Sequence, residues 1–489
     1  MKIPRLMSTQ HPDNAKIPFF AKNPVLGGED EIEEAFYAFS ELGIDEQLWD
    51  FEGKEVDNYV IKKLFSKYPT YFKKSILGKD KFITFRIPNP EVEKDDGKIL
   101  LETLNSIPRN FDVGTAFGNK DIPPVFEVMI PMCFSEKPLI RLSQYYQNFI
   151  VKNQEKTIYN NDITVAQWIG KFKPDKIRVT PLFETRETIA NSSVYVEKYI
   201  EAEKIKDLQR VWFARSDPAL NYGSVAAVMV GKIGLLGLWD LQEKKSVDIL
   251  PIMGCGSAPF RGNFKPTNVK AMLDAYPNIQ TFTIQSAFKY DYGVRQVIDA
   301  VEEVKDTKRK APIPLDIAQA NKLIDRMEKD YKESVQLLAK TINMASHFVP
   351  RRRLRKLHID LFGYARKSAG VKLPRAITFT CALYSLGLPP EILGLSNITP
   401  QEIDSIREYY KSIDTDMADA LQYFNKDTLS FFPKEIQKRV LKALELFEYE
   451  PDQEHNRLTS SIVKDLKDNN IQEVEDNVVK AARIRQFLG

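Results

Sequence analysis

The chain has 489 residues, of which 43% are hydrophobic and 28% charged, the balance of a folded globular protein. The net charge of +3 is too small to indicate a nucleic-acid or membrane partner. Three widely spaced cysteines, Cys133, Cys255 and Cys381, exclude a disulfide scaffold and a cysteine-rich zinc site, and they are typical of a reduced, cytoplasmic protein. Because we find neither a signal-peptide core nor a run of about 18 apolar residues, we expect no export and no membrane span.

Residues 1–295 alternate short β-branched or aromatic runs with helical patterns, which is typical of repeated βα units. We expect eight strands, at Leu6–Thr9, Leu48–Phe51, Phe82–Ile87, Val125–Ile130, Ile177–Phe183, Val211–Ala214, Ile249–Met253 and Phe282–Ile284. Apolar residues at helical spacing predict helices from Ile32 to Leu42, ended by Gly43, and from Val56 to Phe65. Eight such units predict an α/β fold, a (β/α)8 TIM-type barrel that carries the active site.

Residues 296–489 lose the strand pattern and show long helical patterns instead. The clearest of these patterns lie at Ile317–Phe348, Pro400–Ser412 and Pro433–Glu448. We therefore expect a second, mainly helical region that packs on the barrel and takes part in subunit contacts.

Polar side chains follow the predicted strands, at the end of the barrel where such enzymes build their active sites. His11 follows the first strand, and histidine is the side chain best suited to exchange a proton near neutral pH. An isolated histidine here would more simply be a loop residue bonded to Asp13. The charged residues at the other strand ends favour a catalytic role for His11.

Two carboxylates, Glu184 and Asp217, follow the fifth and sixth predicted strands. Carboxylates on adjacent strand ends can share a hard cation, so this pair predicts a site for Mg²⁺ or Mn²⁺. The alternative is that both are surface acids in salt bridges.

A glycine-rich loop with one arginine follows the seventh strand and contains Gly254, Gly256 and Arg261. Main-chain N–H groups and a guanidinium suit an oxyanion such as phosphate or carboxylate. Further polar groups expected at the same rim are Arg86, Arg215, Gln285 and Lys289. A metal surrounded by anion-binding groups indicates a substrate that carries phosphate and carboxylate and develops enolate charge.

Two other motifs have simpler interpretations. Gly231, Gly234 and Gly237 lack the Gly-Lys-Ser/Thr ending of a phosphate loop, so we expect close helix packing there. The basic run Arg351–Lys356 could bind nucleic acid, but a solvated helix face, a subunit contact or a regulatory anion site fits the near-neutral charge better.

Several segments together resemble the archaeal-type phosphoenolpyruvate carboxylases, and the resemblance extends over most of the chain. The segments are Met7-Ser-Thr-Gln-His-Pro-Asp-Asn14, Trp49-Asp-Phe-Glu-Gly-Lys-Glu55, Phe85-Arg-Ile-Pro-Asn89, Pro124–Met132, Pro181-Leu-Phe-Glu-Thr185, Ala214–Gly223, Gly254–Gly262 and Leu373-Pro-Arg-Ala-Ile377.

The resemblance implies conversion of phosphoenolpyruvate and bicarbonate to oxaloacetate and phosphate, through carboxyphosphate and a metal-bound enolate. It implies Mg²⁺ or Mn²⁺ bound by Glu184 and Asp217, with His11 handling the proton and holding carboxyphosphate. Arg261 and Arg86 would neutralise the phosphate and carboxylate charges. It also implies a homotetramer that replenishes the tricarboxylic acid cycle in the cytoplasm.

The sequence departs from the larger bacterial and plant carboxylases at two positions. Cys255 stands in place of a loop arginine, and Leu220 stands in place of a lysine. We expect Arg215 and Lys289 to replace these cations. Two further arginines could form an inhibitor site for dicarboxylic acids or could be structural, namely Arg366 and Arg375.

Two other functions are open at this stage. Another Mg²⁺-dependent barrel lyase or aldolase acting on a 2-oxo acid would use a similar carboxylate pair. The interpretation as a nucleic-acid-binding or assembly protein would depend on the Arg351–Lys356 run alone. It would leave the residues at the strand ends unexplained.

Overall fold

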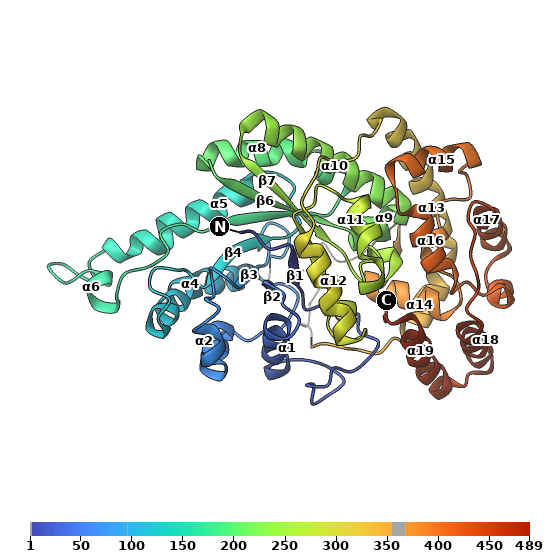
Figure 1. Ribbon diagram of the computed structural model, residues 1–489, viewed down its shortest axis with the longest axis horizontal. Helices are drawn as coiled ribbons and strands as arrows, with labels where there is room; N and C mark the ends of the chain where they lie inside the picture. Colours follow the sequence, from blue (N-terminus) through green and yellow to red (C-terminus); the bar gives the residue numbers. More distant parts are fainter. Residues whose placement is uncertain (1, 95, 355–366, 369) are drawn as a thin grey trace.

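The computed structural model describes residues 2–94, 96–354, 367, 368 and 370–489, and its centre is a closed barrel of eight parallel strands in chain order (Figure 1). The strands are β1 (Leu6–Ser8), β2 (Glu46–Asp50), β3 (Phe82–Arg86), β4 (Val125–Ile130), β5 (Val179–Phe183), β6 (Leu208–Ala214), β7 (Asp248–Gly254) and β8 (Thr281–Ile284). Parallel pairing of β1 with β8 closes the barrel, with Met7 opposite Thr283. The predicted (β/α)8 barrel is confirmed, and each predicted strand overlaps an observed one.

Strands β2 and β6 begin earlier than their apolar patterns predicted, because buried polar residues extend them. Arg210 of β6 donates hydrogen bonds to Glu46 of β2 at 2.8 Å and to Glu127 of β4 at 3.1 Å, and all three side chains are buried. Removing one partner from such a buried charge cluster costs about 3–5 kcal/mol. A hydrophobic pattern cannot reveal strand residues whose burial depends on partners from distant strands.

An apolar layer lies inside the barrel and is built from one side chain on each of six strands. Its members are Met7, Leu48, Met129, Leu182, Trp212 and Ile252. Three of these residues, Leu48, Leu182 and Trp212, also line a cavity at the carboxyl ends of the strands. The layer therefore forms an apolar floor beneath that cavity.

Helices surround the barrel, in the connections between successive strands and, for α12, directly after β8 (Figure 1). They are α1 (Glu29–Ser40), α2 (Val60–Lys67), α3 (Pro69–Phe72), α4 (Gly97–Phe117), α5 (Lys137–Tyr145), α7 (Arg186–Ala190), α8 (Ser192–Glu203), α9 (Ser216–Tyr222), α10 (Ser224–Lys245), α11 (Val269–Ala275) and α12 (Val294–Asp306). The predicted boundary between residues 295 and 296 falls within the first turn of α12, which packs against β1.

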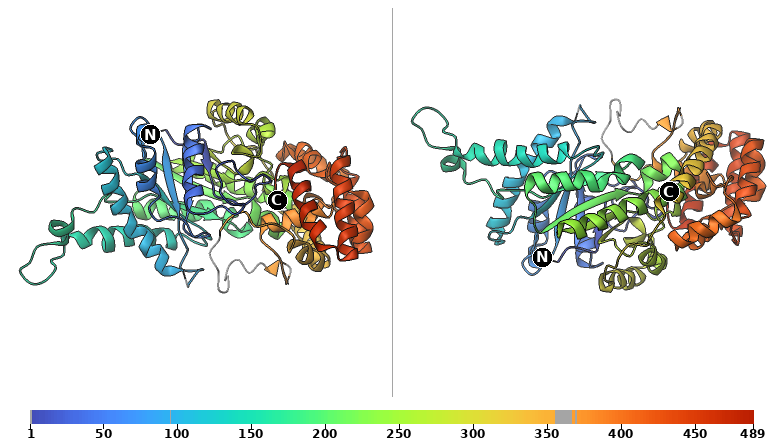
Figure 2. Two further views of the ribbon diagram at one scale, coloured as in Figure 1. Left: turned by 90° about the horizontal axis from the view of Figure 1, so that it is seen from below. Right: turned by 90° about the horizontal axis from the view of Figure 1, so that it is seen from above.

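An arm extends away from the barrel between β4 and β5 (Figures 1 and 2). In the arm, η1 (Tyr146–Ile150) and η2 (Val151–Glu155) follow directly after α5, and the chain returns through α6 (Val165–Ile169). Residues 156–171, the tip of the arm, contain no buried side chain. Tyr159 and Trp168 at this tip are 68% and 67% exposed.

Helices dominate the chain after α12 and form one end of the molecule, opposite the arm (Figure 2). They are α13 (Ile317–Ser346), α14 (Ala376–Ser385), α15 (Pro400–Tyr409), α16 (Ile413–Leu421), α17 (Lys434–Leu444), α18 (Gln453–Asp468) and α19 (Ile471–Arg485), and two short strands, β9 (Lys367–Ser368) and β10 (Val371–Lys372), precede α14. Helix α13 packs on α9 and α10 of the barrel and on α14. This contact joins the helical region to the barrel.

Helix α10 is the one helix among the described residues that is long and apolar enough to cross a membrane by length and composition. The expectation that the chain has no such apolar run is wrong for this helix. Within the fold, 72% of its apolar window is buried. A Cβ at Gly234 would lie 2.7 Å from the Ile189 side chain and 2.8 Å from Phe213. At Gly234, the predicted close packing of this helix is confirmed.

Candidate active site

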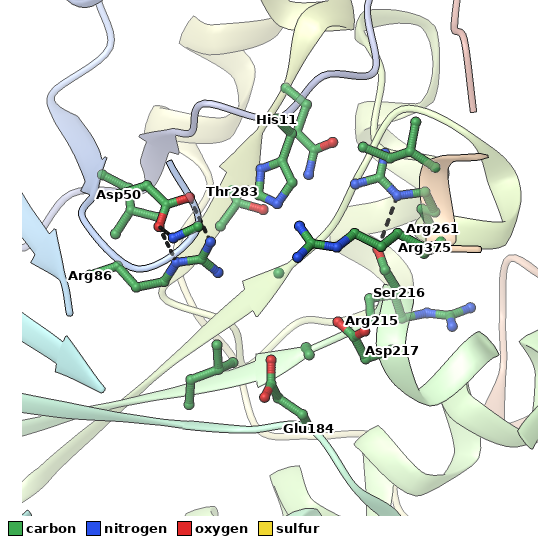
Figure 3. A pocket seen from close by; sticks show the side chains of 18 of the residues that line it. His11, Asp50, Arg86, Glu184, Arg215, Ser216, Asp217, Arg261, Thr283 and Arg375 are labelled. Carbon is green, nitrogen blue, oxygen red and sulfur yellow. Dashed lines mark hydrogen bonds and ion pairs between the residues drawn. The ribbon is translucent and has the colours of Figure 1, made fainter. Parts of the chain in front are cut away.

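The carboxyl ends of the barrel strands surround a cavity, which we call the rim pocket (Figure 3). Eight of the ten predicted site residues line it: His11, Arg86, Glu184, Arg215, Asp217, Gly254, Arg261 and Gln285. The side-chain oxygen of Gln285 is buried and finds no hydrogen-bond donor among the described residues. A water or a ligand in the pocket would satisfy this oxygen.

His11 lies in the loop after β1, partly exposed to the rim pocket. The Thr9 hydroxyl donates to the Ile284 carbonyl at 3.2 Å, so its oxygen accepts from His11 Nδ1 at 2.8 Å. The neutral ring therefore carries its proton on Nδ1, and Nε2 can accept a proton. Burial, and then the positive charges of Lys54 and Arg261, hold the pKa of His11 well below its ordinary value. The imidazole is thus a neutral base near pH 7.

Asp50 at the end of β2 organises two cations on one side of the pocket. Arg86 of β3 binds its carboxylate through two nitrogens, at 2.7 and 2.6 Å, and the Lys54 ammonium binds it at 2.7 Å. Burial alone would raise the pKa of Asp50, but the charges of Arg86 and Lys54 lower it well below its ordinary value. Burial also lowers the pKa of Lys54 to about 8, although Asp50 opposes this shift.

Lys54 lies in the segment between β2 and α2. The sequence pattern predicted that the helix after Lys54 would begin at Val56. Helix α2 begins only at Val60, and the residues before it form the turns that bring Gly53 and Lys54 to the rim pocket. The predicted start of this helix at Val56 is therefore four residues too early.

Arg261 lies on the opposite side of the pocket from Arg86, in the glycine-rich loop after β7 (Figure 3). Its Nε donates to the Ser216 hydroxyl at 3.1 Å, and its Nη1 donates to the Gly489 carbonyl at 3.0 Å. A Cβ at Gly256 would lie 2.8 Å from the Arg261 Cζ. Gly256 does not line the rim pocket itself. Its missing side chain leaves room for the Arg261 guanidinium.

Glu184 and Asp217 lie together at the ends of β5 and β6 (Figure 3). The main-chain N–H of Met132 donates to Glu184 Oε2 at 3.1 Å, and Met132 adopts a φ of 50°. No group of three or more histidine, cysteine or acidic side chains suited to a metal occurs among the described residues. Mg²⁺ commonly binds through one or two carboxylates with water and substrate oxygens, so this pair fits such an ion.

Arg215 contributes to the pocket wall, but its side chain runs away from His11 (Figure 3). Its Nη2 lies 3.4 Å from the Ser224 hydroxyl, and Tyr276 and Asp416 are close enough to raise its pKa against the effect of burial. The structure thus places the charge of Arg215 in a buried polar shell behind the wall.

Lys289 does not line the rim pocket. Its buried ammonium donates to the Thr9 carbonyl at 2.7 Å and to Glu34 at 2.8 Å, behind β1. Cys255 is buried, and burial raises the pKa of its thiol to about 12, while Leu220 is also fully buried. The geometry therefore does not support Lys289 as the replacement for the cations absent at these two positions.

Lys54 and Arg375 are the additional cations that do line the pocket. Lys54 had a local signal, since it follows β2 in a motif that carried the family resemblance. Arg375 immediately precedes α14 of the helical region and enters the pocket from there (Figure 3). Its motif, Leu373–Ile377, also carried the family resemblance, and Arg375 was expected either in an inhibitor site for dicarboxylic acids or in a structural role. The structure places it in the rim pocket, a position that depends on how the helical region packs on the barrel.

The basic run that begins at Arg351 is not a solvated helix face where the structure describes it. Arg351 is exposed, but Arg352 and Arg353 are buried and lie outside any helix. Arg355, Lys356 and the proposed inhibitor-site residue Arg366 lie outside the described residues.

The rim pocket thus combines a proton acceptor, a carboxylate pair and several cations above an apolar floor. Cations at one rim can neutralise a substrate with more than one negative group.

Comparison with known proteins identifies relatives that match over their full length. A family model described as "Phosphoenolpyruvate carboxylase" matches residues 3–489. The phosphoenolpyruvate carboxylases of Methanospirillum hungatei and Pyrococcus furiosus are each 47% identical to this chain, and that of Methanothermobacter thermautotrophicus is 45% identical. Each comparison covers 100% of both chains. The chain therefore belongs to the phosphoenolpyruvate carboxylase family.

Proposed function

We propose that this protein is a carboxy-lyase that converts phosphoenolpyruvate and bicarbonate to oxaloacetate and phosphate. Its full-length similarity to proteins named phosphoenolpyruvate carboxylase supports this reaction. The observation that carries the proposal is the combination, in one pocket, of the His11 imidazole with cations on two sides and the Glu184–Asp217 pair.

The reaction requires two successive group transfers. A bicarbonate oxygen attacks the phosphorus of phosphoenolpyruvate, and the bond from phosphorus to the enol oxygen breaks, giving carboxyphosphate and the enolate of pyruvate. Nε2 of His11 then takes the carboxyl proton of carboxyphosphate, which decomposes to CO₂ and phosphate. The enolate carbon attacks CO₂ to form oxaloacetate, and the proton held by His11 passes to phosphate.

The cations of the rim pocket would hold the anionic groups during these steps. Arg86 and Lys54 share Asp50, so their orientation is set before substrate arrives. Arg261 is oriented by Ser216 on the other side of the pocket. We assign Arg261 and Arg375 to phosphate, and Arg86 and Lys54 to the carboxylate and bicarbonate.

Glu184 and Asp217 would hold Mg²⁺ or Mn²⁺, which when bound supplies positive charge to the enolate oxygen. The Met132 N–H fixes one oxygen of Glu184 by hydrogen bonding. This contact would orient the carboxylate before the ion binds.

The purified protein is expected to produce oxaloacetate from phosphoenolpyruvate, bicarbonate and Mg²⁺. Oxaloacetate is measured through malate dehydrogenase as loss of NADH, and phosphate is measured in the same samples. Equal amounts of oxaloacetate and phosphate, both dependent on bicarbonate, are the expected result. An aldolase or another lyase of 2-oxo acids would show no bicarbonate-dependent release of phosphate, and that outcome would reject the proposal.

Replacing His11 by asparagine should lower kcat by about 10²- to 10⁴-fold, because the variant lacks the proton acceptor. Binding of phosphoenolpyruvate should persist, since the cations and carboxylates stay in place. The matched control is His347→Asn, which alters an exposed histidine at the end of α13 and should leave kcat unchanged. Near-normal turnover of His11→Asn would contradict the role of His11.

Glu184→Gln and Asp217→Asn should each raise the Mg²⁺ concentration needed for half-maximal activity by about tenfold or more, since even residues that only support a ligand contribute about 10- to 100-fold. Mn²⁺ binding, followed by electron paramagnetic resonance, should weaken in parallel. Glu187→Gln, an exposed position in α7, is the control. Unchanged metal titrations in both site variants would exclude these ligands.

We also propose that the protein is a homotetramer in the cytoplasm. The three buried, free cysteines agree with a reducing compartment. The exposed apolar side chains at the tip of the arm, Tyr159 and Trp168, support self-association.

Light scattering after size-exclusion chromatography should give a particle of four times the 56.2-kDa chain mass. Trp168→Lys should reduce this mass, because it places a charge in the apolar contact. Ile471→Lys changes another side chain that is 59% exposed, in α19, and should not reduce it. A wild-type mass of one chain would contradict the assembly, and an unchanged mass in Trp168→Lys would contradict the role of the arm.

A further inference from the structure

The main chain of the loop that carries His11 is held by three buried cations, none of which the proposed reaction uses. Each donates a hydrogen bond to a carbonyl of this loop: Lys289 to Thr9 at 2.7 Å, Arg353 to His11 at 3.2 Å, and Arg352 to Asn14 at 3.1 Å. Of these contacts, only that of Arg353 is made to the histidine itself.

Arg353 is anchored by two acidic residues of α1. Its guanidinium donates to Glu31 at 3.1 Å and to both oxygens of Glu34 at 2.5 and 2.7 Å. Glu34 also accepts from Lys289 at 2.8 Å, so two cations face two carboxylates. Burial would raise the pKa of Glu34, but Arg353 and Lys289 lower it to about 2, so this carboxylate stays charged.

The main chain of Arg353 is fixed as well. Leu26, in the long connection after His11, forms a bridge with Arg353 and exchanges hydrogen bonds of 2.9 Å with the residues on either side of it, Arg352 and Leu354. The side chain of Arg353 is fully buried. Its position is therefore set from both ends, by the bridge at its backbone and by α1 at its guanidinium.

We infer that Arg353 is a positioning residue, which holds the His11 main chain so that the imidazole keeps its bond to Thr9 and directs Nε2 to the substrate. The inference rests on the proposed role of His11. A shift of about 1 Å in a reacting group can cost about 100-fold in rate, so a rigid loop has a direct effect on turnover. Arginine suits this position because its planar fork can serve Glu31, Glu34 and a carbonyl together, whereas lysine is a point charge.

The test compares Arg353→Met and Arg353→Lys with the control Arg351→Met, which alters an exposed arginine two positions earlier. Both Arg353 variants should lower kcat, the methionine variant by about 100-fold, with little change in the KM for phosphoenolpyruvate. Arg353→Lys should retain more activity, because it restores the charge facing Glu34. The double variant Glu31→Gln/Arg353→Met keeps one cation facing one carboxylate. It takes the place of Arg353→Met in the comparison if the single substitution prevents folding.

A second readout reports on His11 without requiring turnover. The chain has four histidines, so ¹⁵N-histidine labelling gives few ring signals, and the His11 signal is the one lost in His11→Asn. In wild type and Arg351→Met, this signal should show the proton on Nδ1. In the Arg353 variants, it should shift toward a mixture of the two neutral forms, because the bond to Thr9 is no longer held.

Lower kcat together with an altered His11 signal supports the inference. Wild-type kcat in the folded Arg353 variants overturns it, as does a lower kcat with an unchanged His11 signal, which would leave Arg353 a structural residue only. If His11→Asn itself proves active, the proposed role of His11 fails, and the ring signals still decide whether Arg353 positions the imidazole.

Discussion

The pairing of β1 with β8 is the interaction on which the site depends. It closes the barrel between the beginning of the chain and a strand more than 270 residues later, with Leu6 opposite Phe282. The same contact continues past the strand, because both the N–H and the hydroxyl of Thr9 donate to the Ile284 carbonyl. The hydroxyl oxygen then accepts from the His11 ring, so closure of the barrel also sets the proton position on the imidazole.

Two sets of charges in the barrel lie on either side of an apolar layer. Below, Arg210 pairs with Glu46 and Glu127 inside the barrel. Above, Asp50 pairs with Arg86 and Lys54 at the pocket wall, where these cations can also meet a ligand. The apolar layer of Met7, Leu48, Met129, Leu182, Trp212 and Ile252 separates the two sets.

The helical region contributes to the site as well as to the fold. Arg375 brings a cation into the rim pocket, and Arg352 and Arg353 hold the loop on which His11 lies. A change in how this region packs would therefore move both a cation of the rim pocket and the proposed base. The arginine run and the loop that carries His11 are far apart in sequence, and their contact links the two parts of the chain.

The sequence alone determined what depends on local order. Short β-branched or aromatic runs between helical patterns indicated eight strands. Residues directly after these strands, such as His11, Glu184 and Asp217, had to reach the carboxyl ends of a parallel barrel. Only the tertiary structure decided where longer side chains end. Lys289 turns to Glu34 behind the strand, while Lys54 turns into the pocket. Both follow strands, but the partner that offsets the burial of each charge comes from elsewhere in the fold, and sequence spacing does not encode that partner.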